Sequence, residues 1–140
     1  MLRFPYGVTK LLSLTLVLLF FKVDSLRGTN ELAYYRAAST SYTVFLEWVT
    51  VREVNLSGFE ILSKRVRDAD VAYAPLGSRI AMGSAMRGAT YTFSITSGLI
   101  LGERYCFRLR EIPSDETSGE AHDLCGYGLL RPIFLPIAYK

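Results

Sequence analysis

Apolar and polar residues alternate along several short stretches of the chain, and turn-forming residues separate these stretches. The clearest run places Val44, Leu46 and Trp48 on one face and turns Phe45 and Glu47 to the other, as in a half-buried strand. Turn signals recur at short intervals, and no ten-residue segment shows a competing helical period. This spacing is typical of an antiparallel sandwich or barrel, so the pattern predicts an all-β domain with seven strands.

Further strands are expected around this run, for a count of seven in all when the weaker pair of edge segments is counted once. The residues expected to point inward are Leu32 and Tyr35, with a bulge or bend between them, then Phe59 and Ile61, Tyr91 and Phe93, and Tyr105 with Phe107 and Leu109. Two short edge segments are expected around Pro75 and Gly77, and Gly126 and Gly128 interrupt the last strand. The predicted core therefore contains Trp48, Phe59, Tyr91, Phe93, Tyr105, Phe107 and Leu109. Trp48 could instead stack on a ligand, but a single Trp on the apolar phase of a strand usually belongs to the core.

The first 25 residues differ from the rest of the chain. Arg3 and Lys10 precede an apolar run over 11–21, and the segment ends on Ser25, a small residue. This order is typical of a secretory signal peptide with cleavage after Ser25. An uncleaved membrane anchor is the alternative, although a spanning helix needs roughly 20 apolar residues. The predicted organisation is a leader over 1–25, one domain over 26–130 and an apolar tail over 131–140.

Composition supports a single domain and changes the argument from charge. At 140 residues with 50% hydrophobic residues, the chain is long enough for one core and short for two. Cleavage after Ser25 would remove three basic residues and one acidic residue, so 16 basic and 13 acidic residues become 13 and 12. The net charge is then +1. A nucleic-acid-binding domain should keep a basic excess, so nucleic acid is not expected as a partner.

Several motifs follow one another in a familiar order. Trp48 ends its strand, "GFEI" opens the next, and "ATYTF" and "LILGERYCFRLRE" come later. Together they resemble a fibronectin type III domain over about 32–130, and they are most similar to the bacterial exported variety, whose sequences run like W-T-T-x-S-E-x-N-N-x-G-F. The residues that match this stretch are Trp48, Val49, Thr50, Glu53, Asn55, Gly58 and Phe59.

The resemblance implies a seven-stranded immunoglobulin-like sandwich with Trp48 between its two sheets. It also makes Tyr105 the corner tyrosine, whose hydroxyl bonds back to the backbone. Val71 stands where the family usually has glycine, and the loop over 113–121 is longer than its counterparts, so loop shapes are expected to differ. Members of the family mostly act as adhesion, spacer or presenting modules.

Catalytic and metal-binding patterns are weak in this sequence. His122 is the only histidine, and its neighbour Asp123 would point to the opposite face of a strand, so an enzyme is not expected. A hydrolase would need a nucleophile and a base that only folding brings together. Four carboxylates near one hairpin loop could hold calcium, but no alternating ligand loop is present and no metal or cofactor is expected. The four are Glu111, Asp115, Glu116 and Glu120.

Two further features concern covalent chemistry. Asn55 begins the sequon "NLS", which would carry a glycan only in a eukaryotic secretory pathway. Cys106 and Cys125 are the only cysteines, and pairing them across a hairpin centres its turn inside the acidic loop. Because the alternate residues of the first strand claim the core face, both cysteines should point outward, directly opposite each other. Export would preserve this disulfide, and two free, separately buried thiols are the alternative.

The expected function is that of a secreted or cell-surface, non-catalytic module for interaction, spacing or presentation. Its expected partner is a protein or the cell envelope, and a membrane only if the leader stays uncleaved. The candidate contact surfaces are the loops over 52–58, 83–88 and 113–121. The alternative is an accessory domain that guides carbohydrate or peptide to an exported enzyme through exposed aromatic residues, for which the candidates are Tyr73, Tyr127 and Tyr139.

The tail continues apolar beyond the expected last strand. Pro132 and Pro136 exclude a central strand there but permit an edge strand or an extended arm. Residues 133–135 are expected to extend along or beyond the sandwich edge and to offer a surface for a partner. Simple packing over the open end of the core is the alternative.

Overall fold

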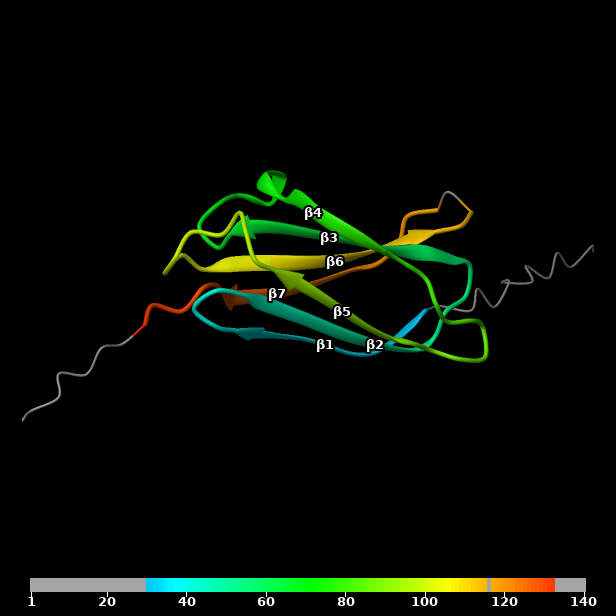
Figure 1. Ribbon diagram of the computed structural model, residues 1–140. Helices are drawn as coiled ribbons and strands as arrows, with labels where there is room; N and C mark the ends of the chain where they lie inside the picture. The colour runs from blue at the N-terminus through cyan, green and yellow to red at the C-terminus, as the bar shows by residue number, and fades with distance from the viewer. Residues whose placement is uncertain (1–29, 116, 133–140) are drawn as a thin grey trace, which may run out of the picture.

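The structure is a computed structural model that describes residues 30–115 and 117–132. Two antiparallel sheets face each other as a β-sandwich (Figure 1). One sheet has the strand order β1-β2-β5 and the other the order β4-β3-β6-β7. The predicted all-β class and the number of strands are confirmed. The strands are β1 (Glu31–Ser39), β2 (Val44–Arg52), β3 (Leu56–Arg65), β4 (Ala74–Ile80), β5 (Thr90–Ile95), β6 (Tyr105–Pro113) and β7 (Ala121–Tyr127).

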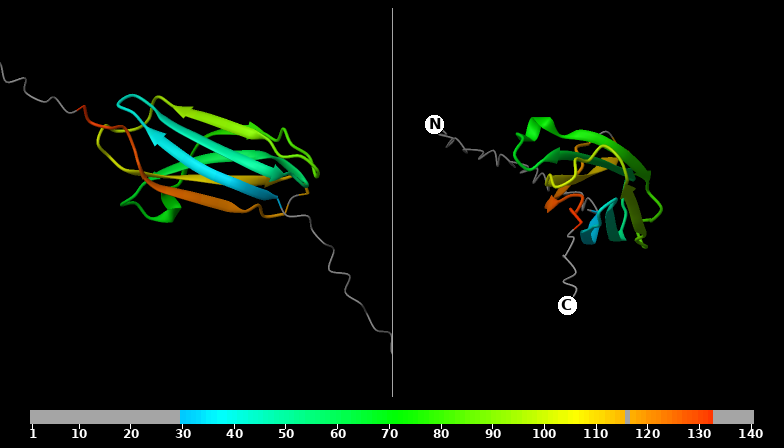
Figure 2. Two further views of the ribbon diagram at one scale, coloured as in Figure 1. Left: turned by 90° about the horizontal axis from the view of Figure 1, so that it is seen from below. Right: turned by 60° about the vertical axis from the view of Figure 1, so that its left-hand side comes forward.

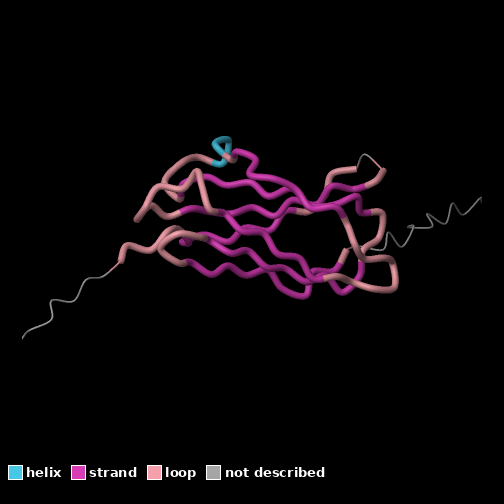
Figure 3. The backbone as a smooth tube through the Cα atoms, viewed as in Figure 1, coloured by secondary structure: helices cyan, strands magenta, loops and turns pink. Residues whose placement is uncertain are grey.

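The sandwich is long in the direction of its strands (Figure 3). The described part of the chain starts at one end of this long axis and finishes at the other, as two further views also show (Figure 2). The expected leader, Glu116 and residues 133–140 of the tail lie outside the described residues. Within the described ranges, no helix is long and apolar enough to cross a membrane.

Trp48 lies at the centre of the core. The alternation along β2 holds, because Val44, Leu46 and Trp48 are at most 1% exposed. The Trp48 ring stacks on Tyr91 of the neighbouring strand β5 at 5.1 Å between centroids, and it meets Phe59 of the opposite sheet edge-on at 5.5 Å. Trp48 therefore fills the space between the sheets, and burying such a ring stabilises the fold by about 2–3 kcal/mol.

All seven predicted core residues join one cluster, and Phe93 is the one that is only partly buried. Its ring lies where β5 meets β4 at the open edge of the sandwich. A Cβ on Gly77 would lie 2.9 Å from this ring, and the Arg79 guanidinium covers it at 4.7 Å from the centroid. Arg79 also donates to the carbonyl of Thr92 at 3.2 Å. Side chains thus cover an edge that would otherwise offer backbone groups to another strand.

Tyr105 makes the bond expected of a corner tyrosine. Its hydroxyl accepts the backbone N–H of Ile100 at 3.0 Å, five residues upstream. Gly102 lies between them with a φ of +80°, which favours glycine and turns the chain back toward β6.

The first strand contains the expected irregularity. Its pairing with β2 shifts register between Glu31 and Leu32 and again between Leu32 and Tyr34. Leu32 and Tyr35 both pack against the core despite their odd spacing. An extra residue between two inward side chains is what a β-bulge supplies.

The predicted loop over 52–58 is wrong in its extent, because β3 begins at Leu56 and only three residues separate it from β2. Asn55 adopts a φ of +51°, which makes so tight a turn feasible. Gly58 belongs to the strand, where a Cβ would lie 2.3 Å from the carbonyl oxygen of Arg79. The close approach of β4 at this point requires glycine.

The predicted pair of edge segments around Pro75 and Gly77 is also wrong. One continuous strand, β4, pairs with β3 and follows a short 3-10 helix, η1 (Asp70–Ala72). The pairing passes Pro75 through a register shift between Ile61 and Leu62. Because β4 is an edge strand, proline needs no hydrogen bond on its outer side.

Candidate functional site

The loop over 81–89 joins β4 to β5, and one buried carboxylate holds it in place. Glu53 is 5% exposed. One of its oxygens accepts the Thr50 hydroxyl at 2.6 Å and the Tyr91 hydroxyl at 2.7 Å, and the other accepts the N–H of Gly83 at 2.7 Å. A carboxylate buried without donors costs several kcal/mol, so these three bonds explain how Glu53 is tolerated inside.

Backbone groups of the same loop complete this network. The Tyr91 hydroxyl accepts the N–H of Met82 at 2.7 Å, and the N–H of Ala89 donates to the Thr50 hydroxyl at 2.9 Å. Gly88 passes so close to β2 that a Cβ would lie 1.8 Å from the Thr50 carbonyl oxygen. Burial raises the pKa of Tyr91 to about 12, so its hydroxyl keeps the proton that it donates to Glu53.

The outcome is a fixed loop, here called the braced loop (residues 81–89), with apolar side chains on its outside. Met82 is 65% exposed and Met86 is 94% exposed, and Ile80 at the end of β4 is 82% exposed. Methionine adapts to irregular apolar surfaces, and a preformed backbone loses less entropy when a partner binds. The candidate loop over 83–88 lies inside the braced loop.

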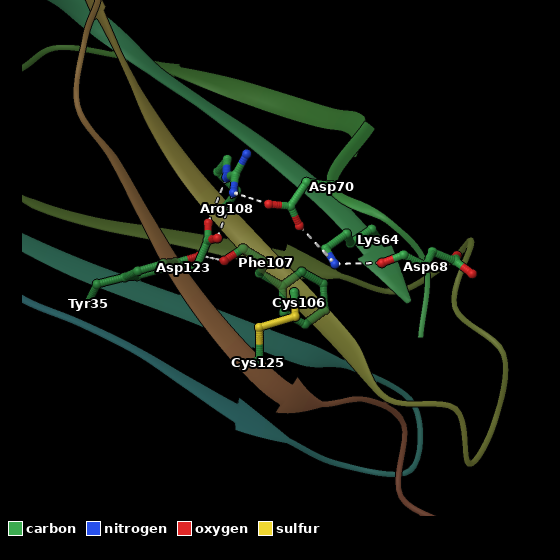
Figure 4. Close-up of a disulfide and its surroundings, with 9 residues drawn as sticks. All are labelled: Tyr35, Lys64, Asp68, Asp70, Cys106, Phe107, Arg108, Asp123 and Cys125. Carbon is green, nitrogen blue, oxygen red and sulfur yellow. Dashed lines mark hydrogen bonds and ion pairs between the residues drawn. A yellow bond between two sulfur atoms is a disulfide. The ribbon is translucent and has the colours of Figure 1, made fainter. Parts of the chain in front are cut away.

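A second cluster lies on the outward face of the four-stranded sheet (Figure 4). Arg108 on β6 donates twice to Asp123 on β7, each time at 2.7 Å. The Arg108 guanidinium also lies 3.9 Å from the centroid of the Tyr73 ring. Lys64 on β3 pairs with Asp70 of η1 at 3.2 Å. These contacts fasten the segment with η1 onto the sheet.

The charges in this cluster are fixed by their neighbours. Hydrogen bonds from Arg108 are the main reason why the pKa of Asp123 lies below its ordinary value, and they outweigh the opposing effect of burial. Burial raises the pKa of Tyr73 to about 12, and the nearby Asp123 carboxylate adds to this shift. The Tyr73 hydroxyl itself is buried without a hydrogen bond of acceptable geometry to the described residues. At neutral pH the cluster therefore combines an ion pair with a neutral tyrosine.

Cys106 and Cys125 form the expected disulfide. They are direct partners in the β6–β7 register, and Arg110 pairs with Ala121 in the same register, so the predicted hairpin alignment is confirmed. The cysteines lie on the outward face, but Cys106 is only 4% exposed while Cys125 is exposed. The predicted outward orientation holds, and Cys106 is nevertheless buried between Cys125 and Lys64, whose side chain is itself only 9% exposed.

The sequence candidates for catalysis are not brought together. His122 pairs with Leu109 and shares its inward side, whereas Asp123 bonds to Arg108 on the outward side, as alternation requires. His122 Nε2 is buried without a hydrogen bond, and its nearest carboxylate oxygen, on Glu120, is 3.9 Å away.

Three of the four candidate calcium ligands line one cavity of about 160 Å³ at the β6–β7 loop, namely Glu111, Asp115 and Glu120, while Glu116 is not described. The Glu111 carboxylate accepts the amide of Asn30 at 2.9 Å, and Asp115 accepts the Thr117 hydroxyl at 2.6 Å. In the described ranges, no three His, Cys, Asp or Glu side chains are grouped closely enough to hold a metal ion.

The aromatic candidates for ligand guidance do not form an exposed row. Tyr73 is half-buried beneath Arg108 and Lys64, and Tyr127 is half-buried against the core. Tyr139 lies outside the described residues. Asn55 is exposed in the β2–β3 turn, so its side chain is accessible to a modifying enzyme.

No family model, curated protein or solved structure matches this chain. The most informative residue, Glu53, was expected only as part of the resemblance to fibronectin type III sequences, without a role. A single acidic residue between a core strand and a glycine is a weak signal, because a carboxylate in a turn usually faces water. Its partners Gly83 and Tyr91 lie 30 or more residues away and become neighbours only through folding.

Proposed function

We propose that the chain is a non-catalytic interaction or structural module of the fibronectin type III kind that works outside the cytoplasm. The observation that carries this proposal is the braced loop. A buried carboxylate and a buried tyrosine fix its backbone, and Met82 and Met86 project from it into solvent. Holding flexible apolar side chains on a rigid scaffold suits contact with a partner surface.

The strand order supports the fibronectin type III interpretation. Sheets ordered β1-β2-β5 and β4-β3-β6-β7, a tryptophan between them and a bonded corner tyrosine fit what the resemblance implies. The disulfide supports an oxidising compartment, which agrees with the leader expected over 1–25. The two ends of the described chain lie at opposite ends of the sandwich, which also suits a spacer.

The test measures association of the purified mature chain with envelope fragments of the cells that produce it. Sedimentation of a labelled protein should give saturable binding for the wild type. The double variant Met82→Ser/Met86→Ser should bind at least about tenfold more weakly, since two buried methionines contribute well over 1.4 kcal/mol. The matched control is Tyr42→Ser, which removes an 82% exposed side chain before β2, at the other end of the sandwich.

Equal binding by all three proteins would show that the braced loop is not the contact surface. If the protein binds no fraction at all, only the spacer role would be left. The second candidate is the carbohydrate- or peptide-guiding accessory domain. Specific binding on a saccharide array, lost on Tyr127→Ala but kept in the methionine variant, would favour that candidate instead.

A further inference from the structure

The two sulfur atoms of the disulfide have unequal surroundings. Cys125 is exposed on the edge strand β7, whereas Cys106 is 4% exposed in the middle of the sheet. Four further residue pairs hold β6 against β7 in the same register, and Tyr105 pairs with Tyr127 beyond a register shift. The hairpin therefore keeps its pairing when the disulfide opens, and a reagent from solvent can approach on the Cys125 side.

Cys106 also has a lysine as its register partner on β3, and the ammonium of this residue, Lys64, donates to the Asp68 carbonyl at 2.7 Å. In the register of the sheet, Cys106 lies between Cys125 on β7 and Lys64 on β3, so the three side chains form one row on the outward face (Figure 4). The other charged groups facing this row are Arg108, which is held by Asp123, and Asp70, which is 3.2 Å from Lys64. An ammonium group next to a sulfur stabilises the thiolate over the thiol.

We propose that the Cys106–Cys125 bond is a thiol-exchange site that reacts with an external thiolate at Cys125. The incoming sulfur forms a bond to the Cys125 sulfur, the bond between the two cysteines breaks, and its electron pair leaves on Cys106. The products are a mixed disulfide at Cys125 and a Cys106 thiolate beside Lys64. Attack by that thiolate on Cys125 reverses the step and releases the external thiol, so no further oxidant or reductant is needed.

The arrangement favours exchange for two reasons. Nucleophilic attack needs access to one sulfur, and Cys125 provides it. The rate also rises as the leaving thiol becomes more acidic, and Lys64 supplies that effect at the sulfur that leaves. Glutathione represents a small thiol and a thioredoxin represents a protein thiol, and the chemistry at Cys125 is the same for both.

The experiment incubates the oxidised mature chain with reduced glutathione or with a resolving-cysteine variant of thioredoxin, which traps the mixed disulfide. Free thiols are then alkylated, and peptide mass spectrometry locates the adduct. The adduct should be on Cys125 and the alkyl group on Cys106. Lys64→Gln should slow the exchange about threefold or more, and Lys64→Arg should keep nearly the wild-type rate.

Arg67→Gln is the matched control, because it removes one positive charge from a nearby exposed site that pairs with Glu103 at 3.5 Å. It should leave the rate unchanged. Trp48 fluorescence must report a folded core throughout. Reaction with glutathione assigns the site to small thiols as well, and reaction with thioredoxin alone assigns it to protein thiols. The proposal would be overturned by an adduct on Cys106, by an unchanged rate in Lys64→Gln, or by exchange that occurs only in unfolded protein. If a variant misfolds, the position of the adduct in the wild type still decides the question.

Discussion

At the scale of single residues, Glu53 shows how a buried charge can shape a surface. Its carboxylate accepts bonds from the two hydroxyls of Thr50 and Tyr91 and from one backbone N–H, and no described cation pairs with it. Hydrogen bonds to a charged group are worth about 1.5–3 kcal/mol, and leaving their donors buried without a partner adds a further penalty. The position of the braced loop therefore depends on this one side chain.

Glu53→Ala should lower the free energy of unfolding by about 3 kcal/mol, because it leaves the Tyr91 hydroxyl and the Gly83 N–H without an acceptor. Urea unfolding followed by Trp48 fluorescence measures this change. Glu31→Ala is the control: its carboxylate is 57% exposed and 3.8 Å from Arg52, so the loss should stay below about 0.5 kcal/mol. A similar loss in both variants would show that the three bonds are not what stabilises this end.

Whether the role of a residue could be predicted from the sequence depends on how far along the chain its contact partners lie. Trp48, Phe59 and the cysteine pair were predictable because strand alternation and hairpin register are local rules. Glu53 and Arg79 were not predicted, since their roles need β5 and the braced loop to be near them in space. Alternation also predicts only which face a side chain is on. It does not show how far neighbouring side chains cover that face, and so it did not distinguish the buried Cys106 from the exposed Cys125.

At the scale of elements, the braced loop and β2 fit together at Gly88. A Cβ at this position would lie 1.8 Å from the carbonyl oxygen of Thr50, which is part of the backbone and cannot move aside alone. The N–H of Thr50 on β2 also donates to the carbonyl of Ala89 in the braced loop at 3.0 Å. Any side chain at position 88 must therefore separate the loop from the strand.

Gly88→Ala should lower the free energy of unfolding by about 2–3 kcal/mol through this steric conflict. It should also speed amide hydrogen exchange at Met82 and Gly83. The comparison is Gly98→Ala, where the added Cβ meets no atom within 4 Å but the φ of +80° remains unfavourable. That variant should lose only about 1 kcal/mol, with no change at the braced loop. Unchanged exchange at Met82 in Gly88→Ala would contradict the close fit.

The ion pair between Arg108 and Asp123, on the sheet face that carries η1, should make the stability of the fold depend on pH. The pKa of Asp123 is lowered below its ordinary value of 3.8 by Arg108, so the ionised form is favoured in the folded state. A lowered pKa contributes stability that is present above the ordinary value and is lost as the pH falls through the folded pKa. The stability that Asp123 contributes is therefore lost at pH values below about 4.

Asp123→Asn should accordingly show a smaller drop in urea midpoint between pH 5 and pH 2.5 than the wild type. Arg108→Met should have the same flattening effect, because it removes the cause of the shift. At pH 7 either variant should lose at most about 1 kcal/mol, since the Asp123 side chain is 37% exposed and water screens the pair. A wild-type slope in both variants would assign the acid sensitivity to other carboxylates.

At the scale of the whole molecule, the disulfide reinforces a hairpin that the sheet already holds. Its two cysteines are 19 residues apart, and closing a loop of that size restricts the unfolded chain. Cys106→Ala/Cys125→Ala should therefore unfold about 2–3 kcal/mol more easily, on the chain-entropy account, yet keep its native fold. Urea unfolding measures the loss of stability, and a near-ultraviolet circular dichroism spectrum shows whether the native fold is kept. A double variant without native tertiary signal would mean that the bond is required for folding.

The long axis of the sandwich gives the molecule a mechanical character. Tension applied at Asn30 and Pro132 would pull β1 and β7 lengthwise against their neighbours, so many hydrogen bonds would have to shear together before either strand slides free. The covalent bridge would then keep 19 residues from extending, a difference in contour length of roughly 65 Å. Optical-tweezer traces taken with and without a reductant should differ by that length, so an exchange of thiols in the surroundings would set how far the unfolded module stretches.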